Sequence, residues 1–102
     1  MPYEIEFTTE SLADLKLLIP IARSKVIDAI EIHLIHNPTQ ESKSRSKRLR
    51  EMDKPQYRLR VDEIRIFSDV RENIVEIIAI VPKSKAAQWL LREGKTTEPT
   101  EE

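Results

Sequence analysis

Three arginines, Arg58, Arg60 and Arg65, stand in two short runs of β-branched and aromatic residues. Side chains alternate between the two faces of a strand, so Arg58 and Arg60 share one face of the first run. Guanidinium groups donate hydrogen bonds in a fixed fork that matches the oxygens of a phosphate. Two interpretations of this pattern stay open, namely a solvated outer face of a sheet and a cationic groove that holds phosphates.

The loop before these runs is also basic. The net charge of the chain is −1, but residues 43 to 60 carry eight Lys or Arg against two acidic residues. The local sign of the charge, and not the sum over the chain, sets the field at a binding face. We therefore predict contacts to RNA phosphates from Lys43, Arg45, Lys47, Arg48, Arg50 and Lys54.

Several other chemistries find no support in the sequence. There is no cysteine, and a single glycine excludes a glycine-rich phosphate loop and a Gly-x-Ser-x-Gly nucleophile motif. His33 and His36 have a spacing that can chelate a metal on a helix, but no third ligand with suitable spacing is visible. We expect no metal and no cofactor, and we interpret the two histidines as a solvated or packed pair at a helix C-terminus.

The strands that must position the arginines can be predicted from the pattern of apolar and polar residues in the sequence. Three β-rich runs between residues 56 and 81 are separated by two short polar breaks, which predicts an antiparallel meander. The third run is apolar on both faces except at Glu76, so we expect it to be an inner strand. Residues 3–7 alternate as a half-buried strand.

Two helices are expected between the first strand and the meander. Thr8 or Thr9 caps the first helix, and Pro20 starts the second, which runs to about His36. A short helix over about 85–93, with Ser84 as its cap and Gly94 at its end, follows the meander.

The predicted fold is therefore α+β. Two N-terminal helices pack on a small, mainly antiparallel four-stranded sheet in the order β-α-α-β-β-β, and a short C-terminal helix follows. We expect one domain over residues 1–94 and an acidic, disordered tail over residues 95–102. No apolar run is long enough to span a membrane, and the N-terminus is acidic where a signal peptide would be basic, so a cytoplasmic protein is expected.

The stretch from Tyr57 to Val70 carries a family resemblance. It reads Tyr-Arg-Leu-Arg-Val-x-x-Ile-Arg-Ile-Phe-x-Asp-Val and is followed by an apolar strand. This pattern resembles the RelE/ParE superfamily of toxins from bacterial type II toxin–antitoxin pairs. The likeness includes the first strand and the helical pair, and it extends as far as Gly94.

The resemblance implies a toxin that inhibits translation by ribosome-dependent cleavage of messenger RNA without a metal, and that a cognate antitoxin neutralises. The implied catalytic residues are Arg58, Arg60 and Arg65 on the strands, with Lys83 and Lys85 after the last strand. Trp89 and Leu90 are the implied antitoxin contacts, and a toxin–antitoxin hetero-oligomer is implied as well.

The sequence departs from the family pattern where proton transfer is expected. Phe67 stands where many members have Tyr, and Trp89 and Leu90 lie near the position of a C-terminal Tyr. A tryptophan has no phenolic proton to donate. Two alternatives therefore stay open, a ParE-like DNA gyrase inhibitor that cuts nothing and an attenuated toxin-fold binding protein.

Overall fold

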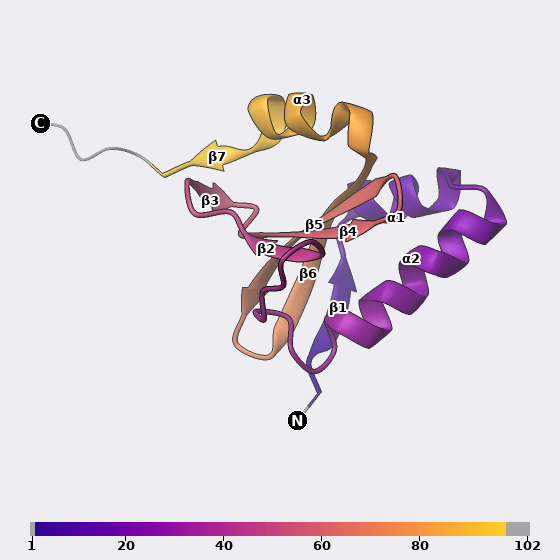
Figure 1. Cartoon of the computed structure of the whole chain (residues 1–102), viewed down its shortest axis with the longest axis horizontal. Helices are drawn as coiled ribbons and strands as arrows, with labels where there is room; N and C mark the ends of the chain where they lie inside the picture. Colours follow the sequence, from indigo (N-terminus) through magenta and orange to yellow (C-terminus); the bar gives the residue numbers. More distant parts are fainter. Residues whose placement is uncertain (1, 98–102) are drawn as a thin grey trace, which may run out of the picture.

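Three consecutive antiparallel strands form the centre of the protein (Figure 1). They are β4 (Tyr57–Val61), β5 (Ile64–Arg71) and β6 (Ile74–Pro82), and two-residue turns join them. The predicted meander is confirmed. The computed structural model describes residues 2–97, and the statements below concern that part of the chain.

The sheet has five strands in the order β1-β6-β5-β4-β2. β1 (Glu4–Phe7) runs parallel to β6, which makes β6 an inner strand as predicted. β2 (Ser46–Arg48) pairs antiparallel with β4. The prediction of four strands missed β2 because its three polar residues show no apolar alternation. Its backbone N–H groups are organised by Ser42, whose Oγ accepts from the N–H of Ser46 at 3.0 Å.

Helices α1 (Thr9–Leu17) and α2 (Pro20–His33) cover one face of this sheet (Figure 1). Thr8 caps α1, because its Oγ1 accepts the N–H of Ser11 at 3.0 Å, and Pro20 occupies the first turn of α2. Both predictions are confirmed. The second helix ends at His33 and not at about His36, because Leu34 closes the last turn with its N–H on the carbonyl of Ile30.

Helix α3 (Lys83–Glu93) lies over the opposite face of the sheet (Figure 1). Its N-cap is Pro82 and no side chain caps it, so the prediction that Ser84 caps the helix was wrong; Ser84 lies inside the first turn. Gly94 ends the helix as predicted, donating its N–H to the carbonyl of Leu90. A Cβ at Gly94 would meet that carbonyl oxygen at 2.6 Å, so the glycine is required by space.

A second, two-stranded sheet joins β3 (Met52–Lys54) to β7 (Lys95–Thr96). The polar character of residues 95 and 96 predicts a disordered tail, whereas in the structure they pair with β3, and Thr97 donates its N–H to the carbonyl of Glu51 at 3.0 Å. The remaining tail residues 98–102 lie outside the described residues. This two-stranded sheet connects the end of α3 to the segment between β2 and β4.

Two clusters of buried side chains lie on the two faces of the sheet. The larger cluster joins α1 and α2 to β4, β5 and β6, and it includes Leu15, Val26, Leu59 and Ile77. The smaller cluster lies under α3 and contains Phe67, Ile78 and Ala79, with Trp89 packed against it. A bulge after Phe67 places the adjacent residues Ile78 and Ala79 in the same cluster.

The two turns of the meander hold non-glycine residues in the left-handed region. Asp62 and Glu72 both have φ of 53°. Such a conformation places Cβ close to a backbone oxygen and costs roughly 1 kcal/mol per residue. The chain therefore makes its hairpins without glycine, at a cost in stability that the sheet must offset.

No helix within residues 2–97 is long and apolar enough to cross a bilayer.

Candidate nucleic-acid interface

The register of the sheet brings the predicted arginines onto one face. Arg58 lies opposite Phe67 on β5 and opposite Lys47 on β2, and Arg60 lies opposite Arg65. Phe67 belongs to the cluster under α3, so these basic side chains emerge on the α3 side of the sheet. We call Lys47, Arg58, Arg60 and Arg65 the basic sheet face.

Arg58 is the centre of this face and is half-buried. Its Nε is buried and has no hydrogen-bond partner among the described residues. Burial lowers the pKa of Arg58, and the charges of Arg60 and Arg65 lower it further. A buried donor without an acceptor costs free energy, and an oxygen of a bound anion would supply the missing acceptor.

Arg60 and Arg65 form a direct cross-strand pair of like charges. Like charges at opposite positions of two strands destabilise a sheet. Burial, and then Arg60, lowers the pKa of the Arg65 guanidinium. The sequence thus maintains three guanidinium groups in positions that repel one another, which is unfavourable for folding and favourable for holding a polyanion.

Arg65 and Arg60 differ in their exposure to solvent. Arg65 is only 5% exposed, and its Nη1 donates to the carbonyls of Asp62 and Ile64, each at 2.9 Å. Arg65 therefore holds the turn between β4 and β5, where Asp62 has its left-handed backbone. Arg60 is exposed, and its guanidinium is accessible to a ligand.

Lys83 and Lys85 lie at one end of the same face. The N–H of Lys83 donates to the carbonyl of Glu63 at 2.7 Å, which joins the first turn of α3 to the turn before Arg65. Both lysine side chains are exposed. The first turn of α3 has no acidic residue and no side-chain cap, so its free N–H groups add to the positive potential.

The aromatic side chains near this face do not offer a phenol. Phe67 is fully buried and stacks on Trp89, with ring centroids 5.0 Å apart and an interplanar angle of 7°. Leu90 packs against the same cluster. Tyr57 neighbours Arg58 along β4 and so points to the opposite side of the sheet. Trp89 and Leu90 are thus packed on the protein itself, and their contact with an antitoxin stays a prediction.

The remaining predicted RNA contacts divide into paired and accessible residues. Arg50 pairs with Glu41 at 2.6 Å, and Lys54 pairs with Asp69 at 3.0 Å. Burial lowers the pKa of Lys54, but Asp69 and Glu76 outweigh it and raise the pKa overall. Arg48 lies over the ring of Tyr57, at 5.4 Å from its centroid. Lys43, Arg45 and Lys47 are exposed, and no carboxylate within residues 2–97 pairs with them.

A groove with a basic rim adjoins Lys47. Its volume is about 600 Å³, and its lining combines charged side chains with the apolar Leu49, Met52 and Leu90. The groove was not predictable from the sequence, because Leu90 of α3 completes its lining from the far end of the chain. Asp69 and Glu76, which hold Lys54, were likewise not predicted, since only the pairing of β5 with β6 brings them together.

The described residues contain no group of three His, Cys, Asp or Glu side chains placed to hold a metal ion.

The fold has counterparts among solved structures. No family model matches the chain, and no curated protein matches it. Among solved structures, the chain is similar to one from the toxin–antitoxin complex RelBE2 of Mycobacterium tuberculosis, with 21% identity and a TM-score of 0.64. The match covers 80% of this chain and 99% of that one.

A second similar structure is the archaeal RelE–RelB complex from Pyrococcus horikoshii OT3. The identity is 16% and the TM-score is 0.60, over 83% of this chain and 99% of that one. At these identities the likeness establishes the fold. The protein has the α+β fold of the RelE toxins, as the resemblance in its sequence implied.

Proposed function

We propose that this protein is the toxin of a type II toxin–antitoxin pair and that it cleaves messenger RNA on the ribosome. The observation that carries the proposal is the buried Nε of Arg58, which has no partner within residues 2–97 at the centre of a cationic face. The RelE fold and its two neighbours in toxin–antitoxin complexes support the toxin assignment. Cytoplasmic action and a cognate antitoxin are part of this proposal.

Cleavage of this kind uses the RNA's own 2′-hydroxyl as nucleophile. The 2′-oxygen attacks the neighbouring phosphorus and its proton passes to solvent, while the bond between phosphorus and the 5′-oxygen breaks and the 5′-oxygen takes up a proton. Arg58 and Arg60 stabilise the negative charge that grows on the phosphate oxygens in the transition state. Arg65 fixes the turn beside them, and its own contact with the phosphate is part of the proposal.

Proton transfer is assigned to the lysines of the α3 N-terminus. An arginine stays protonated near neutral pH and is a poor base, whereas a lysine can lose its proton when its surroundings disfavour the charge. Lys83 and Lys85 are exposed beside the turn that Arg65 holds. This placement supports either lysine as the group that protonates the leaving oxygen.

A second candidate, a ParE-like inhibitor of DNA gyrase, is favoured by one observation. No tyrosine lies on the basic sheet face, and Trp89 is stacked on Phe67. A protein that poisons a partner, or an attenuated toxin-fold binding protein, needs no proton donor at this position. The cationic surface favours a phosphate ligand over a gyrase surface.

Controlled expression in bacteria without the antitoxin tests the proposal. Pulse-labelling follows protein and DNA synthesis, and primer extension maps cuts in messenger RNA. The proposal expects protein synthesis to stop first, with cleaved messages, and expects Arg58→Gln to abolish both effects. Arg71→Gln is the matched control, because Arg71 is an exposed arginine of β5 paired with Glu6 at 3.5 Å.

Three outcomes contradict cleavage. Arrest of DNA synthesis before protein synthesis would establish the gyrase alternative. Normal growth despite soluble protein would establish a toxin-fold binder without toxicity. Arrest that Arg58→Gln leaves unchanged would remove the basic sheet face from the mechanism.

A further inference from the structure

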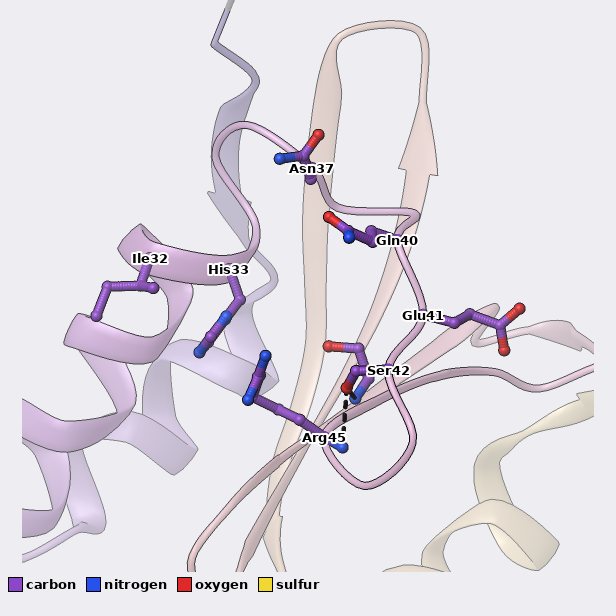
Figure 2. Close-up of a pocket in the computed structure, with 8 residues that line it drawn as sticks. Ile32, His33, Asn37, Gln40, Glu41, Ser42 and Arg45 are labelled. Atoms are coloured by element: carbon purple, nitrogen blue, oxygen red, sulfur yellow. Dashed lines mark hydrogen bonds between the residues drawn. The ribbon is translucent and has the colours of Figure 1, made fainter.

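A small polar pocket lies at the C-terminal end of α2, against the loop that leads into β2. Its volume is about 110 Å³. Figure 2 shows the imidazole of His33 and the guanidinium of Arg45 pointing toward one another across it. The lining is completed by Ile32, Asn37, Gln40, Glu41, Ser42 and Ser46.

The loop that forms one wall is held by its own hydrogen bonds. Ser42 Oγ accepts the N–H of Arg45 at 3.1 Å and the N–H of Ser46 at 3.0 Å, and the N–H of Ser42 donates to the carbonyl of Ser46 at 2.9 Å. A hydroxyl that accepts two bonds keeps its own hydrogen as a donor. The backbone near Arg45 is therefore fixed, and Ser42 has a proton left to donate.

The pocket contains positive charge without a negative partner. Its one acidic residue, Glu41, points away (Figure 2), where Oε1 accepts the N–H of Arg48 and Oε2 accepts from Arg50. No ion pair within residues 2–97 involves Arg45. Burial lowers the pKa of His33, and the charge of Arg45 lowers it further. Among the other residues that line the pocket, α2 contributes the neutral Ile32 and β2 contributes the neutral Ser46.

We propose that this pocket binds a phosphate group, held between the guanidinium of Arg45 and the imidazolium of His33. Ser42 supplies a neutral donor, and Asn37 and Gln40 also line the pocket. The volume of about 110 Å³ is small, which suits a group of the size of one phosphate rather than a nucleoside. The pocket stands apart from the basic sheet face, and its test requires no toxin activity.

Binding of an anion here is linked to protonation of His33. An anion beside the imidazole favours its charged form, so the anion raises the pKa of His33 and binds more tightly as pH falls through that pKa. Sulfate is a suitable probe because its charge is constant from about pH 5.5 to about pH 7.5, where imidazoles titrate.

The experiment is an NMR titration of the two imidazoles with sodium sulfate at constant ionic strength. We expect sulfate to raise the pKa of His33 and to bind about fivefold more tightly at the lower pH, as for a partly exposed ion pair. His36 is exposed just beyond the same helix and is the internal control, whose imidazole signals sulfate is expected to leave in place. No movement of His33, or equal movement of both histidines, overturns the proposal.

Variants separate the two cationic groups. Arg45→Gln weakens sulfate binding, and His33→Lys keeps binding but removes its pH dependence, since a lysine stays charged throughout. His36→Gln changes neither. Far-UV circular dichroism confirms that each variant is folded. Sulfate binding that persists unchanged in Arg45→Gln would refute the assignment.

A second arm identifies the source of the phosphate. A short oligoribonucleotide carries phosphodiesters, and inorganic sulfate represents a free anion. A His33 pKa that rises with both probes indicates the backbone of a nucleic acid, and one that rises with sulfate alone indicates a free phosphate. Neither result depends on cleavage or growth arrest, so this inference fails or stands separately from the toxin assignment.

Discussion

Replacing Arg58 by leucine is expected to make the protein more stable and inactive at once. Leucine keeps an apolar stem against the sheet and removes the buried Nε that lacks a partner. An unsatisfied buried donor costs about 1–3 kcal/mol, and the lower end applies because the rest of this half-buried side chain reaches solvent. Loss of repulsion from Arg60 and Arg65 adds about 0.2–1 kcal/mol.

Some apolar contact of the longer arginine stem is lost, so a net gain of about 1 kcal/mol is expected. In a domain of this size, that gain corresponds to a rise in Tm of about 4–8 °C. Urea and thermal unfolding followed by far-UV circular dichroism measure it. Arg71→Leu is the control, because its exposed pair with Glu6 contributes within about 0.5 kcal/mol.

The functional half of this prediction is measured with an RNA analogue that lacks the attacking 2′-hydroxyl and so cannot be cut. A charged hydrogen bond contributes about 1.5–3 kcal/mol, so Arg58→Leu is expected to weaken binding by about tenfold to a hundredfold. The reasoning is refuted if Arg58→Leu lowers stability by about 1 kcal/mol or more, because Arg58 would then be a structural residue. It is equally refuted if binding is unchanged.

Four further changes test the fold and its charges. Gly94→Ala is expected to cost about 1–3 kcal/mol in urea unfolding, because its Cβ meets the carbonyl of Leu90 at 2.6 Å; a neutral result would show that α3 can shift. Trp89→Ala loses the stack on Phe67 and is expected to cost about 2–4 kcal/mol, whereas Leu91→Ala, at a side chain 88% exposed, stays within about 0.5 kcal/mol; equal losses would contradict the packing. Glu72→Gly relieves a left-handed backbone and is expected to raise stability by up to about 1 kcal/mol, and a loss would mean that the turn is not strained. The pKa of Lys54 is raised in the folded protein, so its ion pair stabilises the fold fully below the unfolded pKa of 10.5 and is lost only as pH rises through the folded pKa. Lys54→Met is therefore expected to lower stability at neutral pH, and its stability is expected to approach that of the wild type in alkali. A stability difference that does not change with pH would exclude the ion pair as the cause.

The parts of the fold that depend on local pattern were predictable from the sequence. Alternation in Tyr57–Val61 gave the strand and the shared face of Arg58 and Arg60, and Thr8 and Pro20 marked the helix starts. Parts that depend on distant pairing were not predictable. Strand β2 is too short and polar to show a period, and β7 takes its structure only from pairing with β3.

The candidate site follows the same division. The sequence indicated which residues are basic, but it did not separate those that carry a partner from those that do not. Arg50 and Lys54 are neutralised by Glu41 and Asp69, at sequence separations of 9 and 15 residues. Arg65 is held by carbonyls of its own turn, a role that its place in a strand did not reveal. The sequence indicated that His33 lies near a helix end, but it did not indicate that the following loop places Arg45 opposite His33.

The parallel pairing of β1 with β6 determines how late during synthesis the first strand can find its partner. Glu4 to Phe7 take their partners from Ile74 to Ile77, so the first strand stays without its neighbour until most of the chain has been synthesised. Helix α1 packs on the same late strand, and its Leu15 belongs to the same buried cluster as Ile77. Contacts between segments so far apart are slow to form, and exposed apolar surface during the wait invites association with other chains. The first strand and α1 therefore depend on the last third of the chain, and a chain interrupted before Ile74 leaves β1 without its parallel partner and α1 without the strand on which it packs.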